Sequence, residues 1–377
     1  FIWFFIISYK QKKWRIMKEN FLLITGGTGG HVIPAKNFAN YLSNKNINCT
    51  IITDKRGYKY FDNYNGKIYI ISSSNLNGNL IFKIFGIFQI LLGLIQSFII
   101  IFLLKPSHSI SFGSYASFSP MLTCMLFKPI YKVKLYIHEQ NSIIGRTNKF
   151  FLNFSNKLFL NFDIKSKINS KFKDKIFVVG SPENNFQKNN NISNKNSKSN
   201  FTIFISGGSQ GSEFVSNFAT NLIKIIDDEK IIKAKFIFQC SKHLIKKYEA
   251  ELQNIKSPII LKDFFINVDE ILANSNLAIC RAGAGTIVDL INFKLPSILI
   301  PLPSSKDNHQ FFNAEILAKH DLAIIFDQNN DDLDKAKRHI YETYSNESKL
   351  ESMNKKFDMI KVKNSNTLIY KLILNAN

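Results

Sequence analysis

Along most of this chain, short apolar runs alternate with segments in which apolar residues recur at the spacing of a helix. The run FLLIT at 21–25 ends in glycines and precedes helical spacing at 34–42, which predicts a strand, a glycine-rich turn and a helix. The same succession recurs at 201–226, where FTIFI leads into a second glycine-rich turn and a second helical pattern. Two such openings, one in each half, predict two Rossmann-like α/β domains in tandem.

Further apolar runs bounded by turn residues predict the other strands. They lie at 49–53, 107–111, 135–137, 176–179, 236–238, 259–261, 277–280 and 297–300. Helical patterns separate most of these runs, which favours a parallel sheet in each half. A final helix is expected at 367–374, and it is a candidate to pack back on the first domain.

A chain of 377 residues suits two domains of common size. The predicted organisation is a first domain at 17–183, a polar linker at 184–200, a second domain at 201–355 and a helical C-terminal segment at 356–377. Residues 1–16 are interpreted as upstream sequence outside the fold, because Met17 stands just before the first strand. Their charges follow the opening apolar run, which reverses the order of a signal peptide.

The charge balance favours an anionic partner. Lys and Arg number 49 against 28 Asp and Glu, a formal charge of +21. This suits nucleic acid, phospholipid headgroups or a phosphorylated substrate, and part of it reflects a chain-wide bias toward Lys, Asn, Ile and Phe. The four cysteines are scattered without metal or disulfide spacing, so reduced thiols are expected.

Three glycine-bearing turns point to phosphate chemistry. GGTGGH at 26–31 follows a strand and opens a helix, so its amides and the helix dipole can face a diphosphate. A dinucleotide fingerprint with Asp54 as ribose ligand is the rival, but Val32 stands where its third glycine belongs. SGGSQG at 206–211 and RAGAGT at 281–286 repeat the arrangement, and Asp289 follows the latter by one turn, near ribose hydroxyls.

Polar residues also gather where predicted strands end. HEQN at 138–141 and DNHQ at 307–310 carry amides and carboxylates suited to sugar hydroxyls. DLD at 332–334 matches a metal-binding pattern, but it stands at the start of a helical segment, where capping is the better explanation.

The stretch at 84–104 is uncharged and long enough to span a bilayer. Predicted strands of one sheet stand before and after it, so a single crossing would divide that sheet, and a span is rejected. We expect instead a helix interrupted near Gly86 or Gly93 that buries one side. Its other side, with Lys83 nearby, would form an apolar and basic patch drawn to anionic phospholipid. The residues expected at this surface are Leu80, Phe82, Phe85 and Phe88.

Six segments together resemble one known family. They are GGTGGHVIPA at 26–35, FGSY at 112–115, HEQNSIIGRTNK at 138–149, SGGSQGS at 206–212, CRAGAGT at 280–286 and DNHQFFNA at 307–314. In this order, over residues 17–318, they resemble the bacterial peptidoglycan N-acetylglucosaminyltransferase family. A coincidence of ordered motifs is more specific than any one of them.

The resemblance implies the GT-B architecture, with two Rossmann-like domains whose parallel sheets face a central cleft. It implies an inverting transfer of N-acetylglucosamine from UDP-N-acetylglucosamine to the C4 hydroxyl of undecaprenyl-diphospho-muramoylpentapeptide. The enzyme would be peripheral on the cytoplasmic face of the inner membrane. No cofactor, no metal ion and no nucleic acid are implied.

The resemblance also implies site residues. The donor residues would be Thr28, Gly29, Gly30, Asn141, Ser209, Ile266, Ala284, Gly285, Thr286, Ile287, Val288, Asp289, His309 and Gln310. The acceptor residues would be Gly27, Thr28, His31, Ser114 and Tyr115. His31 is the candidate base, since its pKa class suits neutral pH, or else it orients the loop or contacts the acceptor diphosphate; Glu139 is a second catalytic candidate.

The chain departs from the family pattern at three places. Ser114 stands where a glycine is frequent, Asp289 where a glutamate is frequent, and Asn184 where an arginine contacts the donor. The alternatives are a nicotinamide-dependent oxidoreductase, another UDP-sugar transferase of GT-B type, and a basic protein that binds nucleic acid or membranes.

Overall fold

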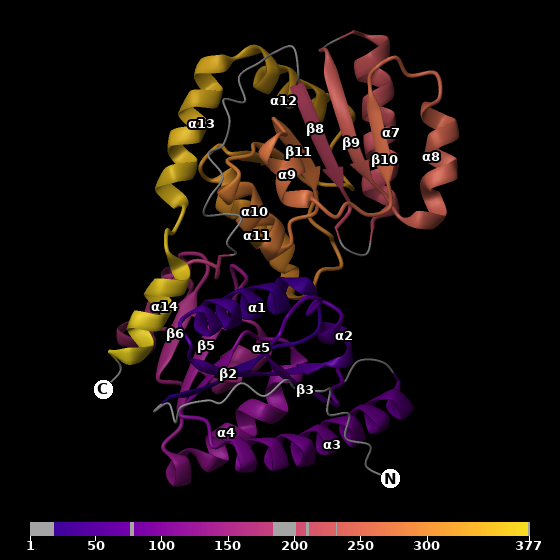
Figure 1. Ribbon diagram of the computed structural model, residues 1–377. Coiled ribbons are helices and arrows are strands. Elements are labelled where there is room, and N and C mark those ends of the chain that lie inside the picture. The colour runs from indigo at the N-terminus through magenta and orange to yellow at the C-terminus, as the bar shows by residue number, and fades with distance from the viewer. Residues whose placement is uncertain (1–18, 76–78, 184–200, 209–210, 231, 376–377) are drawn as a thin grey trace.

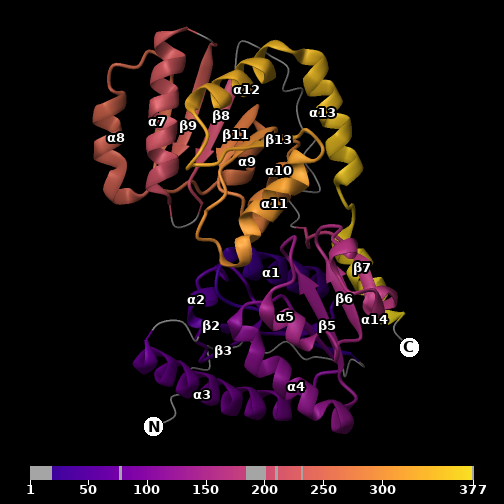
Figure 2. The ribbon, with the colours of Figure 1, turned by 180° about the vertical axis from the view of Figure 1, so that it is seen from behind.

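The structure is a computed structural model that describes residues 19–75, 79–183, 201–208, 211–230 and 232–375 (Figure 1). The predicted extension at 1–16 and the linker at 184–200 lie outside these residues. Within them the chain forms two sheets, of seven and six strands, with every neighbouring pair of strands parallel. Helices cover both faces of each sheet (Figures 1 and 2), which is the arrangement that buries parallel strands.

The first sheet has the strand order β3-β2-β1-β4-β5-β6-β7. Its strands are β1 Asn20–Ile24, β2 Asn48–Asp54, β3 Lys67–Ile71, β4 His108–Ser111, β5 Lys134–Glu139, β6 Lys157–Leu160 and β7 Ile176–Val178. Alternate residues of β1 enter opposite cores: Phe21 and Leu23 face α1 and α14, whereas Leu22 and Ile24 share a cluster with residues of α3 and α4.

The second sheet has the order β10-β9-β8-β11-β12-β13. Its strands are β8 Phe201–Ser206, β9 Ala234–Gln239, β10 Ile259–Lys262, β11 Leu277–Cys280, β12 Ser297–Leu299 and β13 Ala323–Ile325. Helices α7, α8 and α12 cover one face, and α9, α10, α11 and α13 cover the other. One apolar cluster contains residues of both halves, among them Leu160 and Ile291.

The helices follow the predicted alternation with the strands. Their bounds are α1 Gly29–Asn44, α2 Lys55–Tyr58, α3 Leu80–Leu104, α4 Phe118–Tyr131, α5 Arg146–Phe151, α7 Glu213–Asp228, α8 Ile245–Leu252, α9 Val268–Ala273, α10 Ala284–Asn292, α11 His309–Ala318, α12 Leu333–Ser345, α13 Glu347–Ile360 and α14 Ser365–Leu374. The chain returns to the first half through α14 (Figures 1 and 2), whose Ile369 and Ile373 lie in the same buried cluster as Phe21.

Helix α3 is continuous, so the prediction of an interruption near Gly86 or Gly93 is wrong. Both glycines face the protein, and a Cβ on Gly93 would stand 2.2 Å from the carbonyl oxygen of Ser72. These glycines therefore allow close packing rather than a break. The helix is apolar and long enough to cross a membrane by composition, with a mean hydropathy of 2.6. It connects β3 to β4 of one sheet, which keeps both of its ends on the same side of any bilayer.

The outer side of α3 is exposed, as expected. The exposed fractions are 73% for Leu80, 64% for Phe82, 57% for Phe85 and 62% for Phe88. Leu126 and Ile130 on α4, which packs against α3, and Phe150 on α5 are exposed as well. A large exposed apolar surface marks an interaction site.

Candidate active site

The expected segments converge because of strand order. In the first sheet, β2 lies on one side of β1 and β4 lies on the other, so the chain builds the sheet first toward one edge and then toward the opposite edge. In the second sheet, β8 lies between β9 and β11 in the same way. At such a switch point the connecting loops diverge and leave room for a ligand at the carboxyl ends of the strands. The turns that follow β1, β4, β8 and β11 are the four segments at 26–31, 112–115, 206–211 and 281–286.

The first glycine turn is fixed by Asp54. This buried carboxylate accepts hydrogen bonds from the backbone amides of Gly27 and Gly57, each at 2.9 Å, and pairs with Arg56 at 2.6 Å. Burial opposes ionisation, but the two amides and Arg56 outweigh it and lower the pKa of Asp54. Since its oxygens are engaged inside the protein, Asp54 is a support for the turn, which disfavours the nicotinamide alternative that assigned it to a ribose.

His31 lies in the first turn of α1, and its tautomer is set by the backbone. The Nδ1 atom lies 2.9 Å from the carbonyl oxygen of Phe112, an acceptor only, so Nδ1–H donates and Nε2 keeps its lone pair. Burial lowers the pKa of His31; the charge of Glu139 and this hydrogen bond oppose the shift, and His309 adds to it. His31 is therefore neutral at pH 7, with a basic nitrogen available.

The turn after β4 is strained at Ser114. Its φ of 77° and ψ of 159° lie in a region adopted almost only by glycine. The preceding Gly113 also has a positive φ of 89°, and a Cβ there would approach the His31 ring to 3.1 Å. The backbone conformation thus favours glycine at the position of Ser114.

The HEQN segment divides into supporting and accessible residues. His138 and Gln140 are buried and bonded to each other, and burial lowers the pKa of His138 to about 4. Glu139 is 1% exposed, and its oxygens accept hydrogen bonds from Asn141 N and Nδ2, Gly145 N and Asn148 Nδ2. Only Asn141 is partly exposed, so the structure leaves it as the member of this segment that a ligand can reach.

In the second half, the amino end of α10 carries the expected diphosphate turn. Gly283 caps the helix, and a Cβ on Gly285 would meet open space. Asp289 lies one turn on and is partly buried; poor hydration and the nearby Asp269 raise its pKa to about 8. Thr286 and Val288 are partly exposed, whereas Ala284 and Ile287 are buried.

The DNHQ segment faces the first half. Asp307 pairs with Arg146 at 2.9 Å, and the ammonium group of Lys306 donates to the hydroxyl of Tyr115. His309 and Gln310 begin α11 and are partly exposed. The carbonyl of Gln310 accepts from the amide of Leu302 at 3.0 Å, which leaves its amino group for a ligand.

The remaining expected site residues differ in their exposure and in their place in the fold. Ile266 is 90% exposed after β10, and Thr28 is exposed at the N-cap of α1, with Gly27, Gly29 and Gly30 beside it. Asp332 caps α12 through Lys335 N at 3.1 Å, which confirms the capping interpretation. Ser209 and Asn184 lie outside the described residues.

Two supporting residues were missed from the sequence. The buried guanidinium of Arg281 donates to Ser212 Oγ, Gln328 Oε1 and the carbonyls of Ile300 and Pro301, which ties the N-cap of α7 to the end of β12. Asn313 joins the two halves through its amide. Both stand inside recognised motifs, but no local pattern distinguishes a buried hydrogen-bonding role from a ligand contact.

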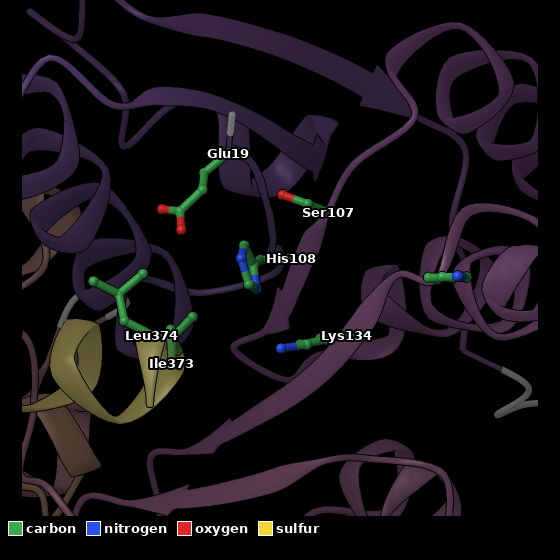
Figure 3. A pocket seen from close by; sticks show the side chains of 7 residues that line it. Glu19, Ser107, His108, Lys134, Ile373 and Leu374 are labelled. Carbon is green, nitrogen blue, oxygen red and sulfur yellow. The ribbon is translucent and has the colours of Figure 1, made fainter. Parts of the chain in front are cut away.

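A cavity of about 310 Å³ lies elsewhere, at the amino ends of β1, β4 and β5 (Figure 3). It is lined by Glu19, Ser107, His108, Lys132, Lys134, Ile373 and Leu374. The amino ends lie at the opposite edge of the sheet from the switch point, and the cavity contains none of the expected site residues. Strand direction therefore favours the facing surfaces of the two halves as the active site.

Ser114→Gly should stabilise the protein. Relief of strain of about 1–3 kcal/mol exceeds the entropic cost of glycine, about 0.5–1 kcal/mol. We expect the free energy of unfolding in urea to rise by about 1 kcal/mol. Lys132→Gly, at an ordinary left-handed position with φ 53°, is the control and should gain less. Equal or opposite effects in the two variants would contradict the assignment of strain to Ser114.

Asp289→Asn should change how stability depends on pH. The carboxyl binds its proton more tightly when folded, with a pKa of about 8 against 3.8 for the ordinary group. Its contribution to stability is thus present below pH 3.8 and is lost as the pH rises to 8. Relative to the wild type, the Asn variant should gain more than about 1 kcal/mol between pH 5 and pH 9. Parallel stability curves over this range would show that Asp289 titrates normally.

Comparison with known proteins agrees with this architecture. The sequence matches the Glycosyltransferase family 28 N-terminal domain over residues 21–160 and the Glycosyltransferase family 28 C-terminal domain over residues 202–369. A relative from Wolbachia sp. subsp. Drosophila simulans (strain wRi) is 30% identical over 368 residues, covering 94% of this chain and 98% of the relative. It is named UDP-N-acetylglucosamine–N-acetylmuramyl-(pentapeptide) pyrophosphoryl-undecaprenol N-acetylglucosamine transferase. A protein of the same name from Rickettsia felis is 31% identical, covering 83% of this chain and 87% of that relative.

Solved structures share the fold. MurG of Acinetobacter baumannii superposes with a TM-score of 0.76 at 21% identity, covering 95% of this chain and 99% of that chain. S. aureus MnaA with UDP superposes with a TM-score of 0.64 at 14% identity, covering 95% and 98%. The two parallel sheets thus have the GT-B arrangement. Since both family 28 domains match in order and the relatives align over nearly their whole length, the chain belongs to glycosyltransferase family 28, in the group of undecaprenol-linked N-acetylglucosamine transferases.

Proposed function

We propose that this protein transfers N-acetylglucosamine from UDP-N-acetylglucosamine to the C4 hydroxyl of undecaprenyl-diphospho-muramoylpentapeptide. The names of its relatives state this class of donor and acceptor. The observation that carries the proposal is His31, whose tautomer leaves a neutral Nε2 in the turn between β1 and α1.

In the proposed reaction the acceptor oxygen attacks the anomeric carbon of the donor sugar. The bond from that carbon to the diphosphate oxygen breaks, and UDP leaves with the electron pair. The acceptor proton passes to Nε2 of His31, since Nδ1 is occupied by the Phe112 carbonyl. The attack comes from the side opposite to UDP, so the product has inverted configuration.

The second half would hold the nucleotide. Amides at the amino end of α10, at Ala284 and Gly285, suit the diphosphate, and they offset charge as it grows on the leaving group. Asp289 would accept hydrogen bonds from ribose hydroxyls, and Ile266 would contact uracil. His309, Gln310 and Asn141 would bind the sugar hydroxyls.

Glu139 is assigned a positioning role. Its carboxylate accepts from both nitrogens of Asn141, at 3.0 and 3.3 Å, and is enclosed by two further donors. A carboxylate in this setting orients Asn141, and its charge opposes the lowering of the pKa of His31 by burial. The acceptor would approach along the turn that contains Ser114 and Tyr115.

The exposed side of α3 is proposed as a peripheral membrane surface on the cytoplasmic side of the cell membrane. Its apolar residues would enter the headgroup region, while Lys83 at the same surface favours anionic lipid. This placement brings the first half to the bilayer that holds the lipid-linked acceptor.

The direct experiment measures UDP release from UDP-N-acetylglucosamine with and without the lipid-linked muramoylpentapeptide. We expect release that depends on the acceptor, together with a new N-acetylglucosamine-containing lipid. Tight NADH binding without UDP-sugar binding would instead support the oxidoreductase alternative.

His31→Gln should lower kcat about 100-fold or more while the donor KM changes little, because a positioned base contributes about that factor. In the wild type, the acidic limb of kcat/KM should lie below pH 6.5, since the pKa of His31 is lowered from that value. His243→Gln on the second half is the control and should retain full activity. A raised donor KM with unchanged kcat would remove His31 from the chemical step.

Phe85→Ser with Phe88→Ser should weaken binding to vesicles that contain anionic phospholipid at least about tenfold, because each exposed ring loses its apolar transfer energy. UDP-N-acetylglucosamine binding should be unchanged. Tyr341→Ser, 52% exposed on α12 of the second half, is the matched control. High salt or alkaline carbonate should release the wild type from membranes. Retention after both treatments would overturn the peripheral arrangement.

A further inference from the structure

Asn313 lies on the first half's side of α11 and is completely buried, with a relative exposure of 0%. Its Nδ2 donates to Asn141 Oδ1 at 3.3 Å and to the Ala282 carbonyl at 3.2 Å. Its Oδ1 accepts from the backbone amide of Ser142 and from Ser142 Oγ, each at 2.9 Å. Both donors and both acceptor positions of this one amide are therefore used.

The orientation of the Asn313 amide follows from its partners. The Ser142 backbone N–H can only donate, and the Ala282 carbonyl can only accept. A rotation of the amide by 180° would place like groups against each other at both sites. The amide therefore fits only one relative arrangement of the partners that surround it.

These partners come from both halves of the molecule. Asn141 and Ser142 follow β5 of the first sheet, whereas Ala282 follows β11 and stands two residues before α10. Asn313 therefore connects the turn assigned to the donor diphosphate with the loop assigned to the donor sugar. If the halves separate, Asn313 keeps its bond to the Ala282 carbonyl but loses its three hydrogen bonds with Asn141 and Ser142 together.

The connection also orients Asn141. Its Oδ1 is occupied by Asn313, and its Nδ2 faces Glu139 Oε1 at 3.3 Å. With one end held from each half, the side chain presents its remaining N–H to a ligand. A contact formed this way depends on the relative position of the two halves.

We propose that Asn313 is a positioning residue that couples the donor-binding turn of the second half to Asn141 of the first half. The inference rests on the proposed function, in which Asn141 contacts the donor sugar. It adds that the contact between Asn141 and the donor sugar forms only when Asn313 holds the two halves in this relative position. UDP alone, which the proposed function places on the second half, does not need this connection.

The test compares UDP-N-acetylglucosamine with UDP on Asn313→Asp of the full chain, by calorimetry. The substitution is isosteric and keeps the acceptor for Ser142, but it places an oxygen against Asn141 Oδ1 and the Ala282 carbonyl. We expect the Kd for UDP-N-acetylglucosamine to rise about tenfold and the Kd for UDP to change less than about twofold. Lowering the pH should recover part of the loss, because a protonated Asp carries one donor.

Asn276→Asp is the matched control. Asn276 is 7% exposed in the second half, and its Oδ1 accepts from the Thr202 amide at 2.8 Å, an interaction that Asp preserves. Both ligands should bind this variant as they bind the wild type. Ser142→Ala, which removes only the hydroxyl from the network, provides a milder variant if Asn313→Asp fails to fold. It should weaken UDP-N-acetylglucosamine about threefold and leave UDP unchanged.

Equal weakening of both ligands in the folded variants would overturn the inference, and so would unchanged binding of both. If the wild type forms the N-acetylglucosamine-containing lipid in either case, the proposed function survives and the inference alone fails. If the wild type binds UDP but not UDP-N-acetylglucosamine, the proposed function fails and the inference fails with it.

Discussion

Parallel strand direction is the constraint on which the rest of the structure depends. In a parallel sheet every carboxyl end lies at one edge, and the loops at that edge diverge where the strand order reverses. Here the reversal occurs beside β1 and β8, the strands that precede the first two glycine turns. The site is thus assembled from segments up to 288 residues apart, Gly26 to Ala314, without any of them having to be near another in the sequence.

Buried side chains, rather than regular backbone structure, hold these loops in place. Asp54 supplies acceptors for the turn after β1, Glu139 for the loop after β5, and Arg281 supplies donors between α7 and β12. Each such group costs desolvation that only a full set of partners offsets. As a result, His31 has Nδ1 fixed by the protein and Nε2 left for a ligand, whereas Asn141 is held at both Oδ1 and Nδ2 and keeps one N–H for a ligand.

The sequence predicted the parts of the fold that have strong local patterns. β1, β2, β8 and β11 and the helices after the glycine turns all lie where apolar runs and turn residues placed them. β3, β6 and β13 were missed, because apolar runs of only three or four residues, such as IYII in β3, cannot be told from helix or loop segments by periodicity alone. The glycines of α3 suggested a break because a local pattern cannot show that Ser72 packs against Gly93.

Site prediction met a similar limit. Glycine turns and ordered motifs located the segments, since they need only local backbone chemistry. Which residue supports and which is accessible depends on contacts between segments: His138 turns inward, Asp54 holds Gly27, and Asn313 reaches the other half. At Ser114 the sequence was informative and the structure explains why. The resemblance marked this position as one that favours glycine, and the positive φ of 77° gives the physical reason for that preference.

The proposed membrane surface and the acceptor turn are joined by one helix. α4 begins three residues after Tyr115 and ends beside the exposed Leu126 and Ile130, and its 14 residues span about 21 Å. A rigid connection of this length fixes the height of the acceptor turn above any bilayer that α3 and α4 enter. The second half has no part in that surface and meets the first through contacts such as Asn313 with Ser142. Under the proposed function, the membrane surface therefore sets the position of the lipid-linked acceptor. The relative position of the two halves sets the position of the donor.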